Sequence, residues 1–187
     1  MKAYLESFNL FSNEEIENFL DICEYKTLKK NDFFLMEDEI CDNISFVVSG
    51  IFRSFYHSNS QDQITYCFTF QNSLLMAYSS FISGEGSKEN IQALTNSKII
   101  TIPKTTLNNL AKSNTNWLQF LKIIAEQEYL ELEKWIFNHQ KDKAQQRYLD
   151  LITKQPKYIK EIPLVYIASY LGVTQRHLSR IRANIDY

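Results

Sequence analysis

The chain has little of what marks several protein classes. Its 187 residues include only 4 Gly and 3 Pro, which excludes a collagen-like or low-complexity chain. No apolar run approaches the ~18 residues that a transmembrane helix needs. The N-terminus carries early acids and no small-residue cleavage site, so no secretory signal is expected. The cysteines, three in number, are scattered at Cys23, Cys41 and Cys67. That pattern excludes a disulfide framework and predicts a cytoplasmic protein.

Signals of catalysis are also absent. The three histidines, His57, His139 and His177, lie far apart in the sequence, so they do not suggest the clustered ligands of a cupin-type metalloenzyme. We find no P-loop, no nucleophile elbow and no paired glycines after a strand. The widely spaced cysteines do not suggest an iron-sulfur cluster. We therefore expect no enzyme activity, no metal site and no cofactor.

What the chain does contain is apolar and aromatic surface and an uneven charge. Hydrophobic residues make up 44% and aromatic residues 14%, enough for a real core in one or two small domains. The net charge of −2 hides a split, because residues 139–187 carry +5 and the rest carries −7. Such asymmetry is expected of a sensor body with a nucleic-acid-binding tail. A solvated basic helical face is the alternative.

The hydrophobic pattern predicts helix, then strands, then helix. Residues 4–25 have helical spacing, with Ser12 and Glu15 as a capping box. From 28 to 102 short alternating runs, such as those at 44–48 and 64–70, are separated by turn signals. Several short strands of this kind indicate a β-sandwich or barrel.

After Pro103 the helical period returns. A short helix is expected at 105–111, followed by a long one that Thr115 or Asn116 caps and that runs to about residue 140. The long helix is apolar on more than one side, and Glu128 interrupts its main stripe. We expect it to pack on its own barrel and on a symmetry mate, giving a homodimer through residues 115–138. Packing on its own barrel alone is the alternative. The apolar positions are Leu118, Phe120, Leu121, Ile124, Ala125, Leu132, Trp135 and Ile136.

The C-terminal stretch IASYLGVTQRHLSRI has the pattern of a helix-turn-helix. Its apolar positions are Ile167, Leu171, Val173, Leu178 and Ile181. Ala168 leaves room for a crossing helix, and Gly172 accepts the left-handed backbone that ends the first helix. Thr174 suits the N-cap of the second helix, and Pro163 suits the first turn of the first. An ordinary helical hairpin that closes the domain is the alternative.

This register leaves a polar, basic face on the second helix. Arg can bond guanine at two acceptors and Gln can bond adenine likewise, while Ser and Thr suit phosphate contacts. His177 by itself fits a surface residue as well as a base reader. The candidate DNA-binding residues are Thr174, Gln175, Arg176, His177, Ser179, Arg180 and Arg182.

Two stretches in this order resemble the Crp/Fnr-type transcriptional regulators. The run LKKNDFFLMEDEICDNISFVVSGIFRSFY, with Gly50 at its turn, resembles the opening of a cyclic-nucleotide-binding β-roll, and IASYLGVTQRHLSRI resembles the family's helix-turn-helix. The resemblance implies an α+β fold with an N-terminal double-stranded β-helix or jelly-roll. It implies an effector or sensor domain at 1–112, a dimerisation helix at 113–140 and a DNA-binding domain at 141–187.

The resemblance also implies partners and roles. A homodimer would place two recognition helices in successive major grooves of double-stranded DNA, at a near-palindromic site. By position, Gln175, Arg176 and Arg180 match the base-reading residues of the family, and RNA polymerase is a further partner that the resemblance allows. The chain resembles a short form without a C-terminal wing. Basic residues before the motif would supply the missing phosphate contacts: Arg147, Lys154, Lys157 and Lys160.

The effector region departs from relatives that bind cyclic AMP. Those relatives carry Gly-Glu-Leu and an Arg-Ser or Arg-Thr pair, whereas this chain has Asn72-Ser73-Leu74 and Ser87-Lys88-Glu89-Asn90. The bidentate guanidinium is missing and Glu89 would repel a phosphate, so we expect no binding of cyclic AMP. The effector is unknown, or there is none. A pocket between the roll and the long helix is expected to be lined by Leu74, Leu75, Met76, Ser80, Lys88 and Asn90.

A second function remains open. The roll could bind a small molecule while the C-terminal helices make protein contacts only.

Overall fold

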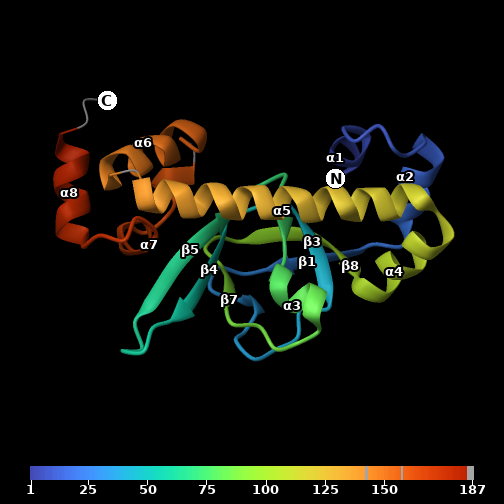
Figure 1. Cartoon of the computed structure of the whole chain (residues 1–187), viewed down its shortest axis with the longest axis horizontal. Coiled ribbons are helices and arrows are strands. Elements are labelled where there is room, and N and C mark those ends of the chain that lie inside the picture. The colour runs from blue at the N-terminus through green and yellow to red at the C-terminus, as the bar shows by residue number, and fades with distance from the viewer. Residues whose placement is uncertain (142, 157, 185–187) are drawn as a thin grey trace. The chain divides into compact units, whose positions relative to one another are not determined.

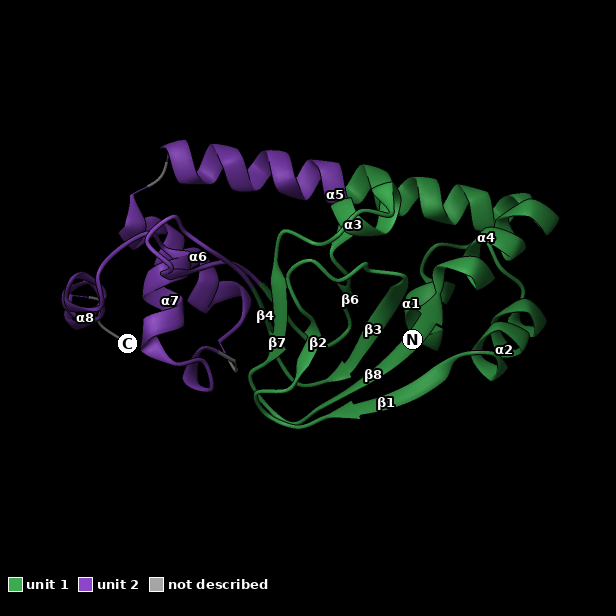
Figure 2. Cartoon of the chain, turned by 90° about the horizontal axis from the view of Figure 1, so that it is seen from below, with its two compact units in different colours: residues 1–54, 68–127 green, residues 55–67, 128–187 purple. Residues whose placement is uncertain are grey.

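A computed structural model describes residues 1–141, 143–156 and 158–184. Lys157 and Asp186 lie outside the described residues. The chain forms two compact units, and the division does not follow the order of the sequence (Figure 2). Unit 1 comprises residues 1–54 and 68–127, and unit 2 comprises residues 55–67 and 128–187.

Two short helices begin unit 1, where a single helix over 4–25 was predicted. Helix α1 spans Lys2–Glu6 and α2 spans Asn13–Asp21. Between them Asn9 adopts a positive φ of 54°, which a continuous α-helix does not allow. The capping box is confirmed, because Ser12 Oγ accepts from Glu15 N and the Glu15 carboxylate accepts from Ser12 N.

The strands form two four-stranded sheets, which confirms the predicted jelly-roll class. In one sheet the order is β1 (Glu24–Leu28), β8 (Ser97–Pro103), β3 (Asn43–Ser49) and β6 (Leu74–Leu75). In the other it is β2 (Phe33–Leu35), β7 (Asn90–Ala93), β4 (Phe52–His57) and β5 (Gln63–Thr69). Strand β3 was expected to alternate, but Ile44–Val47 are all buried, so both faces of the strand are covered there.

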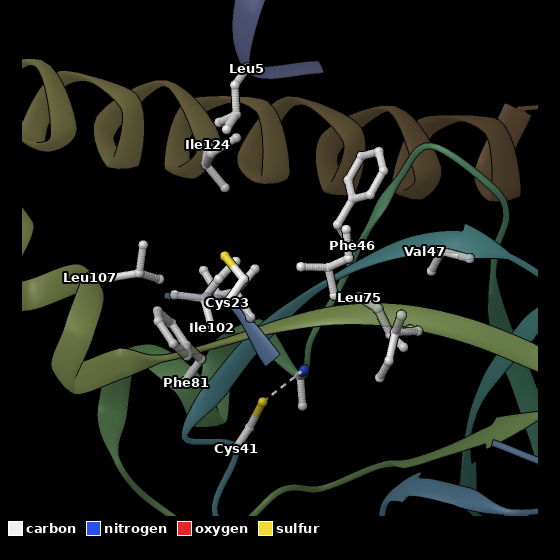
Figure 3. Packing of buried hydrophobic residues seen from close by; sticks show 14 of the residues in the cluster. Leu5, Cys23, Cys41, Phe46, Val47, Leu75, Phe81, Ile102, Leu107 and Ile124 are labelled. Atoms are coloured by element: carbon white, nitrogen blue, oxygen red, sulfur yellow. Dashed lines mark hydrogen bonds between the residues drawn. The ribbon is translucent and has the colours of Figure 1, made fainter. Parts of the chain in front are cut away.

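The core of unit 1 combines buried residues of both sheets with residues of the helices. Helices α3 (Tyr78–Ser83) and α4 (Lys104–Ser113) contribute Phe81 and Leu107 to it, and Ile124 reaches it from the long helix (Figure 3). Cys41 Sγ accepts a hydrogen bond from Ala77 N at 3.4 Å, so this thiol packs as a core residue. Burial raises the pKa of Cys23 to about 11.

The long helix is confirmed as α5, Thr115–Lys141 (Figure 1). Its cap differs from the prediction: the Asn114 Oδ1, one residue before the helix, accepts from Asn116 N at 2.9 Å. Trp117, Phe120 and Ile124 are buried within unit 1, and the Trp117 ring lies 4.3 Å from those of Phe11 and Phe19. Other apolar side chains of α5 are largely exposed: Leu118, Tyr129, Leu130, Leu132, Ile136 and Phe137.

Unit 2 contains the end of α5 and the remaining helices. They are α6 (Ala144–Lys154), the 3₁₀ turn Tyr158–Lys160, α7 (Leu164–Tyr170) and α8 (Gln175–Ala183). Helix α6 was not predicted from the sequence. The small core of this unit includes Tyr148, Leu151, Ile162, Ile167, Ala168, Leu171, Leu178 and Ile181.

Of the helices that the structure describes, none combines the length and apolar character that crossing a bilayer requires. Within the same residues no group of His, Cys, Asp or Glu side chains is arranged to hold a metal ion.

Candidate nucleic-acid interface and effector region

Helices α7 and α8 meet through a tight turn. Ala168 is 2% exposed and Leu178 is fully buried, as the crossing of two helices at a small residue requires. Gly172 has φ +65°, and a Cβ built there would meet nothing within 4 Å. Glycine is therefore favoured at this position by backbone conformation alone, and the chain can reverse within Gly172–Thr174.

Thr174 begins the second helix. Its Oγ1 accepts a hydrogen bond from His177 N at 3.2 Å, which satisfies one of the free N–H groups of the first turn. The helix itself runs from Gln175 to Ala183. The N-terminal turn of α8 is exposed at Gln175, Arg176 and His177. It can approach another molecule without rearranging the turn.

All seven candidate DNA-binding residues are exposed. Arg176 and Arg180 stand four residues apart and so share one side of α8. Helix α8 contains no acidic residue. Within the described residues, the guanidinium groups of Arg176, Arg180 and Arg182 make no ion pair, so their charge faces solvent.

The basic residues before the motif divide into two kinds. Lys154 and Lys160 are exposed and free to meet phosphates. Arg147 is half-buried, and its Nη2 donates to Leu171 O at 2.6 Å. The Arg147 guanidinium therefore hydrogen-bonds within the protein, whereas the sequence suggested that it contacts a phosphate.

The six residues expected to line an effector pocket all lie in unit 1. Leu75 is 1% exposed in the core, and Leu74 and Met76 pack against it. Ser80 Oγ accepts from Cys41 N at 3.0 Å and donates to Glu85 O at 2.6 Å. Lys88 is exposed. The polar side chain of Ser80 is thus already engaged by its own unit.

The segment that would face a cyclic phosphate is closed onto residues 36–39. Ser87 N donates to Glu39 O at 2.8 Å, and Asp38 N donates to Ser87 O at 2.9 Å. A Cβ on Gly86 would lie 2.8 Å from Asp38 O, so the two backbones touch. Asn90 Oδ1 accepts from Glu37 N at 3.1 Å. These contacts tie residues 86–90 to residues 37–39.

A cavity of about 780 Å³ lies in unit 1. It opens between the edge strands β1 and β2, beside β8, and none of the six expected residues is among the described residues that line it. The lining residues are Lys26, Thr27, Leu28, Phe33, Phe34, Leu35, Glu39, Ile40, Cys41, Asp42, Asn43, Ile99 and Thr101.

Comparison with known proteins agrees with this architecture. Residues 25–114 match the family model of the cyclic nucleotide-binding domain. A search of curated protein sequences gives no match.

Solved structures resemble almost the whole chain. FixK2 from Bradyrhizobium japonicum superposes with a TM-score of 0.75 and 16% identity, covering 87% of this chain and 83% of that one. A protein described as a Crp/Fnr-family transcriptional regulator, from Eubacterium rectale, gives 0.71 and 17%, covering 96% and 85%. The c-di-GMP-responsive global regulator CLP from Xanthomonas campestris gives 0.65 and 12%, covering 90% and 88%.

The two findings agree with each other: residues 25–114 are similar to the cyclic nucleotide-binding domain family, a name that describes the domain and not a bound ligand. The fold of the chain as a whole is that of the Crp/Fnr transcriptional regulators, which confirms the resemblance first seen in the sequence.

Proposed function

We propose that the protein is a dimeric, sequence-specific DNA-binding transcriptional regulator of Crp/Fnr type, with α8 as its recognition helix. The observation that carries the proposal is the exposed surface of α8: Arg176 and Arg180 share one side of the helix, Arg182 is exposed next to them in sequence, and the helix has no acid. Side chains near the start of such a helix reach base edges in the major groove. Gln175 and Arg176 occupy that position, and Arg180 follows one turn later.

The long helix supplies the proposed dimer contact. One side of α5 is occupied by the core of unit 1, through Trp117, Phe120 and Ile124. A separate side of α5 exposes Leu118 at 58%, Leu132 at 57%, Tyr129 and Ile136, whose spacings are each close to a whole number of helical turns. A second copy of α5 would bury this side. Two copies of α8 would then face one DNA duplex.

The effector of the proposed regulator is not cyclic AMP. Residues 72–74 and 87–90 lack a guanidinium that could hold a cyclic phosphate. The backbone of Ser87 is hydrogen-bonded to Asp38 and Glu39. Another ligand would regulate the protein by binding one arrangement of the dimer more tightly and so increasing its population.

A gel-shift experiment tests the proposal. Fragments are selected from a random DNA pool with the wild-type protein and then challenged with the double variant Arg176→Ala, Arg180→Ala. We expect the variant to lose specific retardation, because each guanidinium–guanine contact contributes about 1–3 kcal/mol. The double variant Lys29→Ala, Lys30→Ala removes the same charge from the exposed β1–β2 turn and should bind as the wild type does.

The result separates two functions. Loss of retardation only in the α8 variant supports DNA reading by α8. Failure of the wild-type protein to select any fragment, or equal retardation by all three proteins, contradicts it and favours a small-molecule-binding roll whose C-terminal helices contact protein.

A further inference from the structure

The C-terminal end of α7 can be accounted for bond by bond. Val173 N donates to Ala168 O at 3.0 Å, and Gly172 N donates to Ser169 O at 3.0 Å. This pair of bonds is the Schellman motif, with Gly172 as its left-handed residue. The motif satisfies two of the last carbonyls of α7. The carbonyls of Tyr170 and Leu171 remain to be satisfied by other parts of the chain.

Side chains from two other helices lie against those carbonyls. His139 of α5 places Nε2 3.3 Å from Tyr170 O, and Arg147 of α6 donates to Leu171 O. The His139 ring is itself held: its Nδ1 lies 3.0 Å from Trp135 O, and the ring lies 4.1 Å from the Trp135 ring. Cations and N–H donors at the C-terminus of a helix also meet its negative dipole.

The preceding residue is held by the β-hairpin of the same unit. Ser169 Oγ accepts from Thr65 N at 2.9 Å and donates to Gln63 O at 3.2 Å. The N–H of Thr65 and the C=O of Gln63 point to the same edge of the strand, because the two residues are two positions apart. Strand β5 is the last strand of its sheet, so this edge has no neighbouring strand. A single hydroxyl, which both donates and accepts, therefore occupies the open edge of β5.

Three consecutive residues, the last two of α7 and its C-cap Leu171, thus each contact a different element. Ser169 is held by β5, Tyr170 by α5 and Leu171 by α6. The turn Gly172–Thr174 and helix α8 follow at once. We propose that Ser169, His139 and Arg147 are positioning residues that fix the direction of α8, although none of them needs to touch DNA. The consequence for DNA, but not the anchoring itself, depends on the proposed function.

The anchoring is tested by amide exchange, without DNA. Ser169→Thr keeps a hydroxyl and Ser169→Val has the same shape without one, so the pair isolates the hydrogen bonds. An edge amide without a partner exchanges quickly. We expect the Thr65 amide to exchange about tenfold faster in Ser169→Val than in the wild type, and Ser169→Thr to resemble the wild type. Equal exchange in all three proteins would show that the contact does not form.

The effect on α8 is tested by the spacing of the DNA half-sites. The probe is a fragment that the wild-type protein selects from a random pool, with and without one base pair inserted between its half-sites. The insertion rotates one half-site by about 35°, which a fixed pair of recognition helices tolerates poorly. We expect a penalty of about tenfold in affinity for the wild type and for Ser169→Thr, and under about threefold for Ser169→Val.

A second variant protects the test from a local folding defect. His139→Phe keeps a ring that can stack on Trp135 but removes the ring nitrogen that lies 3.3 Å from Tyr170 O, and it should relax the spacing preference in the same way. The salt dependence of binding should not change, because no phosphate contact is lost. An intact spacing preference in both Ser169→Val and His139→Phe overturns the positioning role. If the wild type selects no DNA, the proposed function fails and the Thr65 amide alone decides the anchoring.

Discussion

Gly50 passes so close to Ser97 that a Cβ on residue 50 would lie 2.0 Å from Ser97 Oγ, 2.6 Å from Ser97 Cβ and 2.9 Å from Ser97 Cα. The contact joins the turn after β3 to the start of β8, next to the point where the register of the two strands shifts. Because the Ser97 backbone is involved, trimming the Ser97 side chain would not make room for a larger residue.

Gly50→Ala should therefore destabilise the protein far more than Gly172→Ala. Both glycines have a positive φ, 104° and 65°, but a Cβ on Gly172 meets nothing within 4 Å. We expect Gly172→Ala to cost about 1 kcal/mol in the free energy of unfolding, from backbone strain alone. Gly50→Ala adds overlap with a buried strand, for about 3 kcal/mol or more. Denaturant unfolding monitored by circular dichroism measures both, and equal losses would refute the close approach at Gly50.

Leu132→Glu should dissociate the proposed dimer without unfolding the chain. Leu132 is 57% exposed in the isolated chain, so the substitution should change the stability of the chain by less than about 0.5 kcal/mol. Leu130→Glu is the matched control, because Leu130 is 58% exposed and lies two residues away, on another side of the helix. Light scattering after gel filtration should show a monomer for the first variant and a dimer for the second. The same mass for both variants would argue against this side of α5 as the interface.

Glu128→Gln should stabilise the protein at pH 7 and have little effect near pH 4. Burial, followed by repulsion from Glu131, raises the pKa of Glu128 above its usual value. As pH rises above about 4.3, the unfolded chain loses this proton first, so the ionised carboxylate lowers the stability of the folded state. The amide removes that penalty. Melting temperatures of the wild type and the variant between pH 4 and pH 7 test this prediction, with Glu126→Gln as an exposed control. A rise in melting temperature at pH 4 as large as that at pH 7 would contradict the raised pKa of Glu128.

Iodoacetamide should modify Cys67 well before Cys23 or Cys41. With a pKa of about 11, only about one Cys23 thiol in a thousand is a thiolate at pH 8. Burial also raises the pKa of Cys41, which is 2% exposed. Cys67 is half-exposed on β5. Peptide mass spectrometry should find the first adduct on the Cys67 peptide, whereas in denaturant all three cysteines should react; early modification of Cys23 in the native protein would contradict its burial.

Local patterns in the sequence were enough to predict much of this structure. The capping box at Ser12, the unbroken helix after Asn114 and the turn at Gly172 each depend on residues a few positions apart, and all three are present. The short strands followed from their period and turn signals, although the burial of Ile44–Val47 on both faces of β3 depends on parts of the chain that are distant in sequence. The break at Asn9 was missed because nothing around it marks a positive φ.

The anchors of α7 could not be predicted in this way. Ser169 meets residues more than 100 positions away, and His139 meets Tyr170 across 31 positions. A lone serine or histidine gives no pattern that links it to such a partner. Arg147 was noticed for its charge, but only the coordinates show that its guanidinium is used by Leu171 O. The candidate DNA-binding face was easier to find, because its residues follow one another on a single helix.

The discontinuous make-up of unit 2 limits how the protein could be taken apart or recombined. Residues 55–67 belong with 128–187, and α5 runs unbroken from one unit into the other. A C-terminal gene segment, transplanted alone onto a foreign sensor, would leave behind the hairpin on which Ser169 rests. The recipient would have to provide an edge strand of its own, so inheritance of the DNA-reading part as a simple cassette is disfavoured.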